Sequence, residues 1–195
     1  MKLSRDAVVR AALELLDEVG LADLTLRGVA ERLHVQAPAL YWHVRNRQDL
    51  IDQMAAAMIQ DGIGGIAPDG AWMDQLGDIA RAFRQTLLSH RDGARVLAEA
   101  CTADPAVDRL AELSLRMLTS AGFTTTDAIR AMVSLLSYIT GFVADEQAPR
   151  PRPAAPDPVL FPLLTAVGDG HHTTETFEYG LGLLLSGLRL ARLAT

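Results

Sequence analysis

The stretch LTLRGVAERLHVQAPALYWHVRNR, which runs from Leu24 to Arg47, decides the fold class of this chain. It predicts two short helices separated by a turn at His34-Val-Gln36. Thr25 is a candidate N-cap for the first of them. The second is expected to begin around Ala37-Pro38, where proline is favoured because the first turn of a helix leaves that N–H unpaired.

A longer helix is predicted directly before this pair, between Ser4 as N-cap and Gly20 as C-terminal stop. Its apolar residues recur at helical spacing on one face, at Val8, Ala12, Leu15, Leu16 and Val19. A long helix followed by two short ones has the spacing of a helix-turn-helix, in which the last helix enters the major groove of DNA.

The remainder of the chain also predicts helices. Asn46-Arg-Gln-Asp49 resembles a capping box with Asp in place of Glu, at the start of a long Met- and Ala-rich helix. Glycines at 62–65 and the Pro68-Asp-Gly70 turn then interrupt the pattern. Further helices are expected at about Trp72–Ser89, Arg91–Ala100, Pro105–Ala121, Thr126–Asp145 and Thr174–Leu193. The predicted fold class is all-α, a three-helix helix-turn-helix head on a larger helical body.

Prolines dominate one segment, Ala148–Pro158. They impose extended backbone that cannot continue a helix or pair within a sheet, so a surface loop or linker is expected there.

Composition favours a soluble, cytoplasmic protein. Cys101 is the one cysteine among 195 residues, which excludes an intrachain disulfide and suits a reducing compartment. The sequence contains neither a signal-peptide pattern nor an unbroken apolar run of membrane-spanning length, and no membrane association is expected.

The net charge of −6 looks unfavourable for a DNA-binding protein, but the charge is unevenly distributed. Acidic and basic residues cancel across Met1–Leu50, so the whole deficit lies in the body. Between Thr25 and Arg47, four arginines accompany the single acidic residue Glu31. A locally basic head on an acidic body is compatible with phosphate binding.

The exposed residues of the third helix suit DNA recognition. Small apolar side chains that could meet thymine methyl groups are provided by Ala37, Pro38 and Ala39. Aromatic side chains with polar tips are provided by Tyr41, Trp42 and His43, and phosphate-binding charge by Arg45 and Arg47. The alternative, open from sequence alone, is that Tyr41 and especially Trp42 belong to the core of the head.

The two segments Leu24–Leu33 and Ala37–Arg47 resemble the DNA-binding head of the TetR family of transcriptional regulators. The run Leu-Tyr-Trp-His-Val is especially close to the tetracycline-responsive members. The resemblance continues into the body at Leu87–Val96 and Ser120–Phe123. It covers most of the chain and is weakest at residues 62–74 and 150–176.

This resemblance implies roles for individual head residues. Arg27 matches an arginine that reads guanine, and Pro38 and Tyr41 match residues that pack against bases. Positions that hold the DNA backbone are matched by Thr25, Trp42, His43 and Arg47. Ala37 stands where tetracycline-responsive members have a glutamine that reads adenine, and Leu26 replaces a backbone-contacting threonine. These two departures leave the operator sequence open.

The resemblance also implies the domain organisation and the partners. We expect a DNA-binding domain at 1–47, a connecting helix and hinge at 48–66, and a ligand-binding and dimerisation domain at 67–195. Thr126–Val143 and Thr174–Leu193 are the expected dimer helices, which would form a four-helix bundle in a homodimer on palindromic double-stranded operator DNA. The alternative is that the last helix is simply buried within a monomer.

A candidate effector pocket is predicted in the body. Its residues recur at spacings that can face one interior: Phe83, Leu97, Met117, Ile129, Met132, Tyr138, Phe142 and Asp145. Of these, the resemblance implies drug-site positions for Phe83, Ile129, Met132 and Asp145. Leu97 and Ile79, however, stand where tetracycline-responsive members have a metal-binding histidine and a drug-binding asparagine. We therefore expect a largely apolar effector and not tetracycline.

Neither a cofactor nor an enzymatic activity is predicted. His171-His172 lies in a Gly/Thr-rich segment where no third metal ligand can be placed. A catalytic helical bundle would need a carboxylate–histidine metal pattern or a nucleophile beside a base, and neither spacing is present. The predicted function is a transcriptional repressor that a small molecule releases from its operator.

Overall fold

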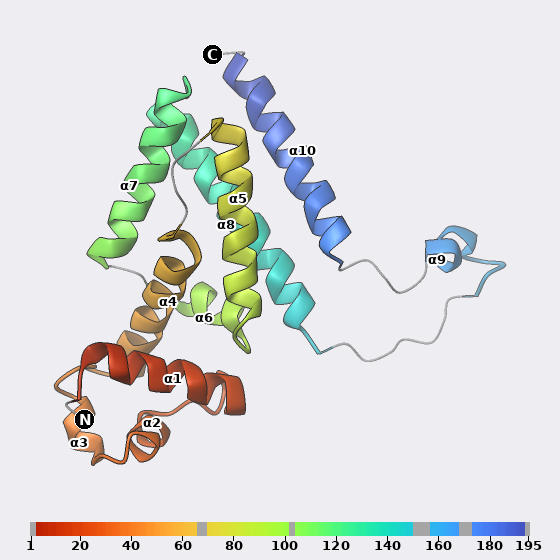
Figure 1. Ribbon diagram of the computed structural model, residues 1–195. Helices are drawn as coiled ribbons and strands as arrows, with labels where there is room; N and C mark the ends of the chain where they lie inside the picture. Colours follow the sequence, from red (N-terminus) through yellow and green to blue (C-terminus); the bar gives the residue numbers. More distant parts are fainter. Residues whose placement is uncertain (1–2, 66–69, 102–103, 150–156, 168–172, 194–195) are drawn as a thin grey trace.

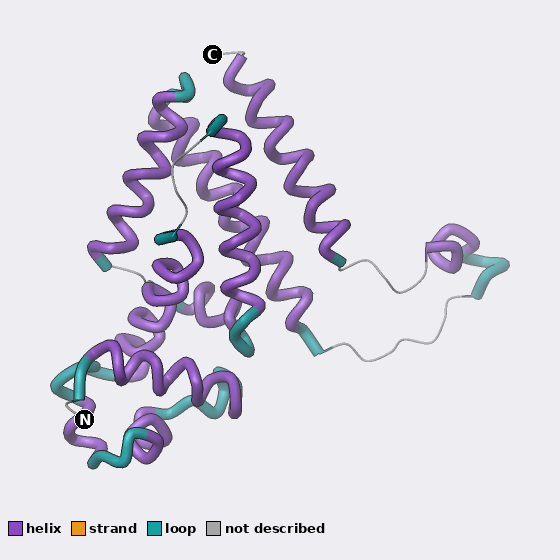
Figure 2. The backbone as a smooth tube through the Cα atoms, viewed as in Figure 1, coloured by secondary structure: helices purple, strands orange, loops and turns teal. Residues whose placement is uncertain are grey.

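The computed structural model of the chain describes residues 3–65, 70–101, 104–149, 157–167 and 173–193. Within these residues all regular secondary structure is helical, as the all-α prediction requires (Figure 2). The helices are α1 (Arg5–Val19), α2 (Leu26–Arg32), α3 (Ala37–Leu40), α4 (Arg47–Ile63), α5 (Trp72–Leu88), α6 (Gly93–Glu99), α7 (Pro105–Ser120), α8 (Thr125–Gln147), α9 (Pro162–Val167) and α10 (Thr174–Leu193).

The ends of α1 are fixed by the two residues that the sequence indicated. The Ser4 hydroxyl accepts a hydrogen bond from the Ala7 amide, and Gly20 stops the helix with a φ of 81°. Its apolar face is completely buried at Val8 and Leu16. The first helix of the head is therefore determined locally, by caps and by an apolar stripe.

The turn between α2 and α3 is a Schellman motif. The Val35 amide donates to the Ala30 carbonyl at 3.0 Å, and the His34 amide donates to the Glu31 carbonyl at 3.1 Å. This motif places His34 in the left-handed region, with a φ of 55°. The turn redirects the chain so that α3 begins at Ala37, with Pro38 in its first turn.

The long helix α4 joins the head to the body (Figure 1). Its N-cap is Asn46, whose side chain accepts from the Asp49 amide at 2.8 Å. The Asp49 carboxylate accepts from the amide of Arg45, one residue earlier than the N-cap that a capping box would use. The N-cap is as predicted, whereas the return bond goes to the amide of Arg45 and not to that of Asn46.

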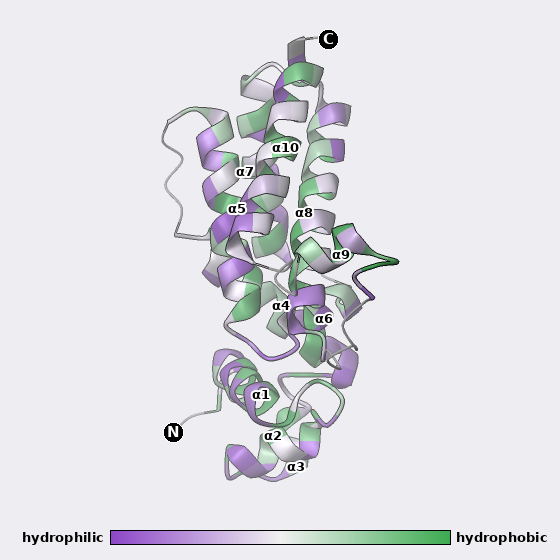
Figure 3. Ribbon diagram, turned by 90° about the vertical axis from the view of Figure 1, so that its right-hand side faces the viewer, coloured by the Kyte–Doolittle hydropathy of each residue, from purple (hydrophilic) through white to green (hydrophobic). Residues whose placement is uncertain are grey.

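The body is a bundle built on α5, α7, α8 and α10, with the short α6 beneath it (Figure 1). Helix α4 approaches α5 closely at Gly62, where an added Cβ would lie 2.7 Å from the Thr86 hydroxyl. Figure 3 shows the head at one end of the elongated molecule and α8 and α10 side by side along the body.

Two details of the helices differ from the sequence prediction. Helix α6 begins at Gly93, not Arg91, because Asp92 adopts a left-handed conformation with a φ of 57°. Helix α9 was not predicted, and it stands apart from the bundle in Figure 1. Most of the proline-rich segment, together with His171 and His172, lies outside the described residues.

Helix α8 is, by length and composition alone, apolar enough to span a membrane, and little of its apolar stretch is buried within one chain. Large apolar side chains also remain exposed on α10, at Tyr179, Leu183 and Leu190. The fold thus leaves an apolar face on two neighbouring helices.

Candidate nucleic-acid interface and ligand pocket

The turn that directly follows α3 presents its aromatic residues to solvent. Trp42 is 89% exposed and Tyr41 58% exposed, so the alternative that they form the core of the head is wrong. The core positions are taken by Leu40 and Val44, which anchor α3 and the turn after it. Pro38 is exposed on the same short helix. The other predicted contact residues of this segment are half-buried: Ala37, Ala39 and His43.

Arg27 lies at the outer surface of α2. Its side chain is 86% exposed, and its Nε donates to the Glu31 carboxylate at 2.9 Å, one helical turn away. Thr25 caps the same helix, and its hydroxyl oxygen accepts from the Gly28 amide at 3.1 Å. The hydroxyl hydrogen of Thr25 therefore remains available to a phosphate oxygen.

Two further arginines of the head have carboxylate partners at hydrogen-bond distance. Arg45 pairs with Asp49 at 3.1 Å, and Arg32 joins α2 to α1 through Glu14 and Glu18. Burial raises the pKa of Asp49, but hydrogen bonds from the Arg45 backbone and guanidinium outweigh it and hold that pKa below its ordinary value. In this pair the Arg45 side chain is 84% exposed and the Asp49 side chain 14% exposed, so the arginine is the member that solvent reaches.

Arg47 is directed into the head. Its Nη2 donates to the Leu21 carbonyl at 2.7 Å, and its Nε donates to the Leu24 carbonyl at 3.3 Å. The side chain therefore holds the segment between α1 and α2 against the start of α4. Two of its nitrogens are occupied in this way, and the third, Nη1, lies 3.9 Å from the Glu99 carboxylate.

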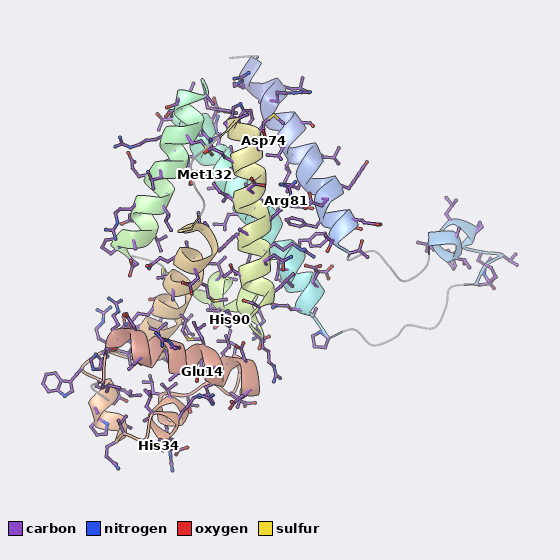
Figure 4. The ribbon with its side chains drawn as sticks, in the orientation of Figure 1. Glu14, His34, Asp74, Arg81, His90 and Met132 are labelled. Atoms are coloured by element: carbon purple, nitrogen blue, oxygen red, sulfur yellow. The ribbon has the colours of Figure 1, made fainter. Side chains whose placement is uncertain are left out.

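A cluster of polar contacts ties the head to the body at the turn between α5 and α6 (Figure 4). The Asp17 carboxylate accepts from the Arg91 amide at 2.9 Å and lies 3.1 Å from Nδ1 of His90. In return, the Asp92 carboxylate accepts from the Leu21 amide at 2.9 Å. These hydrogen bonds join the end of α1 to the start of α6. They form a second connection between head and body, besides the helix α4.

An apolar cavity of about 210 Å³ lies between α4, α5, α7 and α8. Its lining is almost entirely aliphatic: Ile59, Ile63, Leu76, Ile79, Phe83, Val107, Leu110, Ala111, Ser114, Met132, Val133, Leu135, Leu136 and Ile139. Ile59 and Ile63 come from the last turns of α4. A molecule in this cavity would therefore touch the helix that leads directly to the head.

The predicted pocket residues separate into three groups. Phe83 and Met132 line the cavity. Tyr138 and Phe142 instead join Phe177 of α10 in an aromatic cluster, with ring centroids 5.4–5.8 Å apart. The remaining predicted residues lie outside the cavity lining: Leu97, Met117, Ile129 and Asp145.

The aromatic cluster covers a buried ion pair. Arg84 of α5 and Glu146 of α8 meet at 2.5 Å, with side chains only 6% and 11% exposed. The Arg84 guanidinium also lies 4.8 Å from the Phe177 ring centroid, within cation–π range. Tyr138 donates its hydroxyl hydrogen to the Phe177 carbonyl at 2.8 Å. These contacts fasten α5, α8 and α10 to one another.

On α7 the sequence prediction chose Met117 and missed the residues that line the cavity, and it assigned no residue of α4 to the pocket. The signal was present in α7, where Val107, Leu110, Ala111 and Ser114 follow helical spacing. In α4 the relevant pair is Ile59 and Ile63, four residues apart at the end of the Met- and Ala-rich helix. Among the described residues, no group of three or more His, Cys, Asp or Glu side chains is arranged to hold a metal ion.

Two family models match the chain. Residues 8–54 match the model described as bacterial regulatory proteins of the tetR family, and residues 65–192 match the tetracyclin repressor-like C-terminal domain. Together they span both the head and the body.

Similar proteins match over nearly the whole length. The class A tetracycline repressor from transposon 1721 of Escherichia coli is 41% identical, over 98% of this chain and 93% of the repressor. A possible TetR family regulator from Streptomyces coelicolor is 36% identical with a TM-score of 0.83, over 96% of this chain and 100% of that one. A TetR variant from Acinetobacter baumannii in complex with minocycline is 35% identical with a TM-score of 0.80, over 97% and 95% of the two chains.

Proposed function

The chain belongs to the TetR family of bacterial regulatory proteins, which are DNA-binding repressors controlled by small molecules, and we propose that it acts as a homodimeric repressor released from palindromic operator DNA by an apolar effector. The observation that carries the proposal is the combination of the exposed residues on and directly after α2 and α3 with an apolar cavity at the far end of α4.

The apolar face of α8 and α10 supports the homodimer. Tyr179, Leu183 and Leu190 lie on the side of α10 opposite its buried residues. Gly182 and Gly187 have open space where a Cβ would be placed, as has Gly141 of α8. Small residues on a helix surface allow a second helix to approach closely, and a second copy would bury the exposed apolar residues. A membrane is a less suitable partner, since Arg130 and Asp127 lie on α8 itself.

Operator contacts are proposed for the residues that the head exposes. Arg27 is the candidate for reading a guanine, while Pro38 and Tyr41 would pack against bases. Positions proposed to hold the DNA backbone are Thr25, Trp42, His43, Arg45 and Arg47. Two heads must sit about 34–36 Å apart to enter successive major grooves, so a small change in head spacing is enough to lose one half-site.

Effector binding is proposed to act on the head through α4. Ile59 and Ile63 form one wall of the cavity, and Gly62 packs directly against Thr86. This contact leaves no free space between the two helices. A ligand that displaces the end of α4 must therefore move the whole helix as a rigid body. The contacts of Asp17 and Asp92 would transmit a movement of α6 to α1 in the same direction.

The apolar lining also distinguishes the proposed effector from magnesium–tetracycline. Ile79 lines the cavity, and Ser114 provides the only side-chain oxygen or nitrogen among the lining residues. A metal chelate needs several oxygen or nitrogen partners, and this lining does not supply them. We therefore propose that tetracycline with Mg²⁺ leaves the operator complex intact. A cytoplasmic location is proposed, since the protein's DNA target lies there.

The rival functions are an enzyme on a helical bundle and a protein-interaction module that has lost DNA binding. A gel-shift titration against the DNA flanking the protein's own gene separates the proposed repressor from both rivals. The proposed repressor retards a discrete palindromic fragment at concentrations where scrambled DNA stays free. Equal retardation of both fragments, or none, would contradict the proposal. Addition of tetracycline and Mg²⁺ to the retarded complex tests the effector class in the same assay.

A further inference from the structure

Ser114 is the one residue in the lining of the apolar cavity whose side chain carries an oxygen or nitrogen atom; the other thirteen described lining residues are aliphatic, apart from Phe83. It lies in the middle of α7 and is half-buried. Any polar group on a molecule in this cavity must therefore pair with Ser114 or remain without a side-chain partner.

The hydrogen-bonding capacity of Ser114 is partly used. Its Oγ donates to the Leu110 carbonyl at 3.0 Å, the preceding turn of the same helix. A serine hydroxyl has one hydrogen and two lone pairs, so the hydrogen is committed and the lone pairs remain. What Ser114 offers to the cavity is consequently an acceptor.

The lining also limits the charge of an occupant, and the volume indicates the size of the part that it can hold. Burying an ion without a partner is strongly unfavourable, and the lining residues carry no charged group. An apolar cavity of about 150 Å³ holds benzene. At about 210 Å³, this cavity has room for one ring with a short alkyl branch.

We propose that the effector is an uncharged, largely hydrocarbon molecule of about one substituted ring, with a hydroxyl or N–H group that donates to Oγ of Ser114. The inference rests on the proposed function, because it takes this cavity as the effector site. Beyond the proposed function, it specifies the direction of one hydrogen bond: the ligand donates and Oγ of Ser114 accepts.

Three probes of nearly equal shape test this polarity. In 4-tert-butylphenol the ring carries a hydroxyl donor, in 4-tert-butylanisole the oxygen can only accept, and tert-butylbenzene lacks the oxygen. Dissociation constants are measured by calorimetry on the full-length wild-type protein, on Ser114→Ala and on Thr119→Val. Thr119 is the matched control, because its hydroxyl makes the same bond to the Leu115 carbonyl on α7 but does not line the cavity.

The ratio of the anisole to the phenol dissociation constant is the decisive quantity, since it cancels differences in cavity packing. We expect Ser114→Ala to lower this ratio by about three- to tenfold, the size of one net hydrogen bond, and Thr119→Val to leave it unchanged. An unchanged ratio in Ser114→Ala, or no binding of any of the three probes to the wild-type protein, would overturn the proposal.

Operator binding, measured by fluorescence anisotropy on the same preparations, separates this inference from the proposed function. Ser114→Ala is expected to bind operator like the wild-type protein, because Ser114 is remote from the head. If operator binding is intact but the ratio of dissociation constants is the same in Ser114→Ala and the wild-type protein, the proposed ligand class is wrong. The proposed repressor function is then unaffected. If the wild-type protein does not prefer its operator, the proposed function fails whatever the probes do.

Discussion

The carboxylate of Asp92, at the start of α6, accepts a hydrogen bond from the backbone amide of Leu21, at the end of α1, with an N–O distance of 2.9 Å. Asp92 reaches this position in a left-handed conformation, with a φ of 57°, which Asp, Asn and Gly tolerate better than other residues. One residue of the body is thus held in an uncommon conformation while it bonds to the head. Together with the Asp17–Arg91 contact, this hydrogen bond joins the start of α6 to the segment at the end of α1.

Asp92→Gly should weaken communication between effector and operator without unfolding the body. Glycine accepts the positive φ but cannot accept the Leu21 hydrogen bond, whereas Asp92→Asn keeps both properties. We expect the glycine variant to need several-fold more effector for half-maximal operator release, and the asparagine variant to resemble the wild-type protein. The measurement is anisotropy of labelled operator during effector titration. If both variants need the same effector concentration for half-maximal release, the Asp92–Leu21 hydrogen bond does not couple effector binding to operator release.

Glu31→Gln should increase nonspecific DNA binding. The Glu31 carboxylate holds Arg27, and its removal frees that guanidinium for any phosphate. We expect tighter binding to random DNA and a slope of log affinity against log salt that steepens by about 0.9 per subunit. Glu112→Gln is the matched control, because Glu112 forms an equivalent pair with Arg116 on α7, in the body. An identical salt slope in Glu31→Gln and the control would show that Glu31 does not hold Arg27 away from phosphate.

Helix ends could be predicted from the sequence where the contacts that fix them lie between residues close together in the chain. The caps Ser4, Thr25 and Asn46 were predicted correctly, because each bonds to an amide three residues away. The start of α6 was placed too early, because the conformation of Asp92 depends on its contact with Leu21, which is distant in sequence. Helix α9 was missed because it follows a proline-rich segment whose composition favours loops.

The residues of the pocket could not be predicted fully from the sequence, for a different reason. Helix α8 is apolar on two faces, and its periodicity alone does not tell them apart. Met132 faces the cavity with α7, while Tyr138 and Phe142 face α10 and form the aromatic cluster with Phe177. Which face meets which helix depends on tertiary packing, so residues of both were assigned to one interior.

Gly182→Leu should produce a folded monomer. In the single chain, an added Cβ at Gly182 meets nothing within 4 Å, so a larger side chain is accommodated within the subunit. In the proposed dimer it would force the partner helix away. We expect sedimentation velocity to report monomers, with helical circular dichroism preserved and operator affinity lost. Gly180→Leu is the contrasting variant: it would clash with Tyr138 inside the chain and destabilise the fold itself. A Gly182→Leu dimer would mean that the interface lies elsewhere.

Glu146→Ala should destabilise the body strongly, because it leaves the Arg84 guanidinium buried without its carboxylate. Removal of one partner from a buried pair costs about 3–5 kcal/mol in the free energy of unfolding. The double variant Arg84→Met/Glu146→Leu should lose much less, since it leaves no uncompensated charge. Urea unfolding at one fixed protein concentration measures both. A single variant within about 1 kcal/mol of the wild-type protein would contradict the burial of this pair.

The most direct test of the account is the effect of Arg27→Ala on operator and random DNA of equal length. If this head reads sequence through α2 and α3, the variant should lose about 1–3 kcal/mol of binding free energy on the operator and relax the preference at one base pair of each half-site. Its affinity for random DNA should change far less. Anisotropy titrations of the wild-type protein and the variant, at one salt concentration, supply the four dissociation constants. A loss confined to the operator supports base reading by Arg27, whereas equal losses on both DNAs, or none on either, would contradict it.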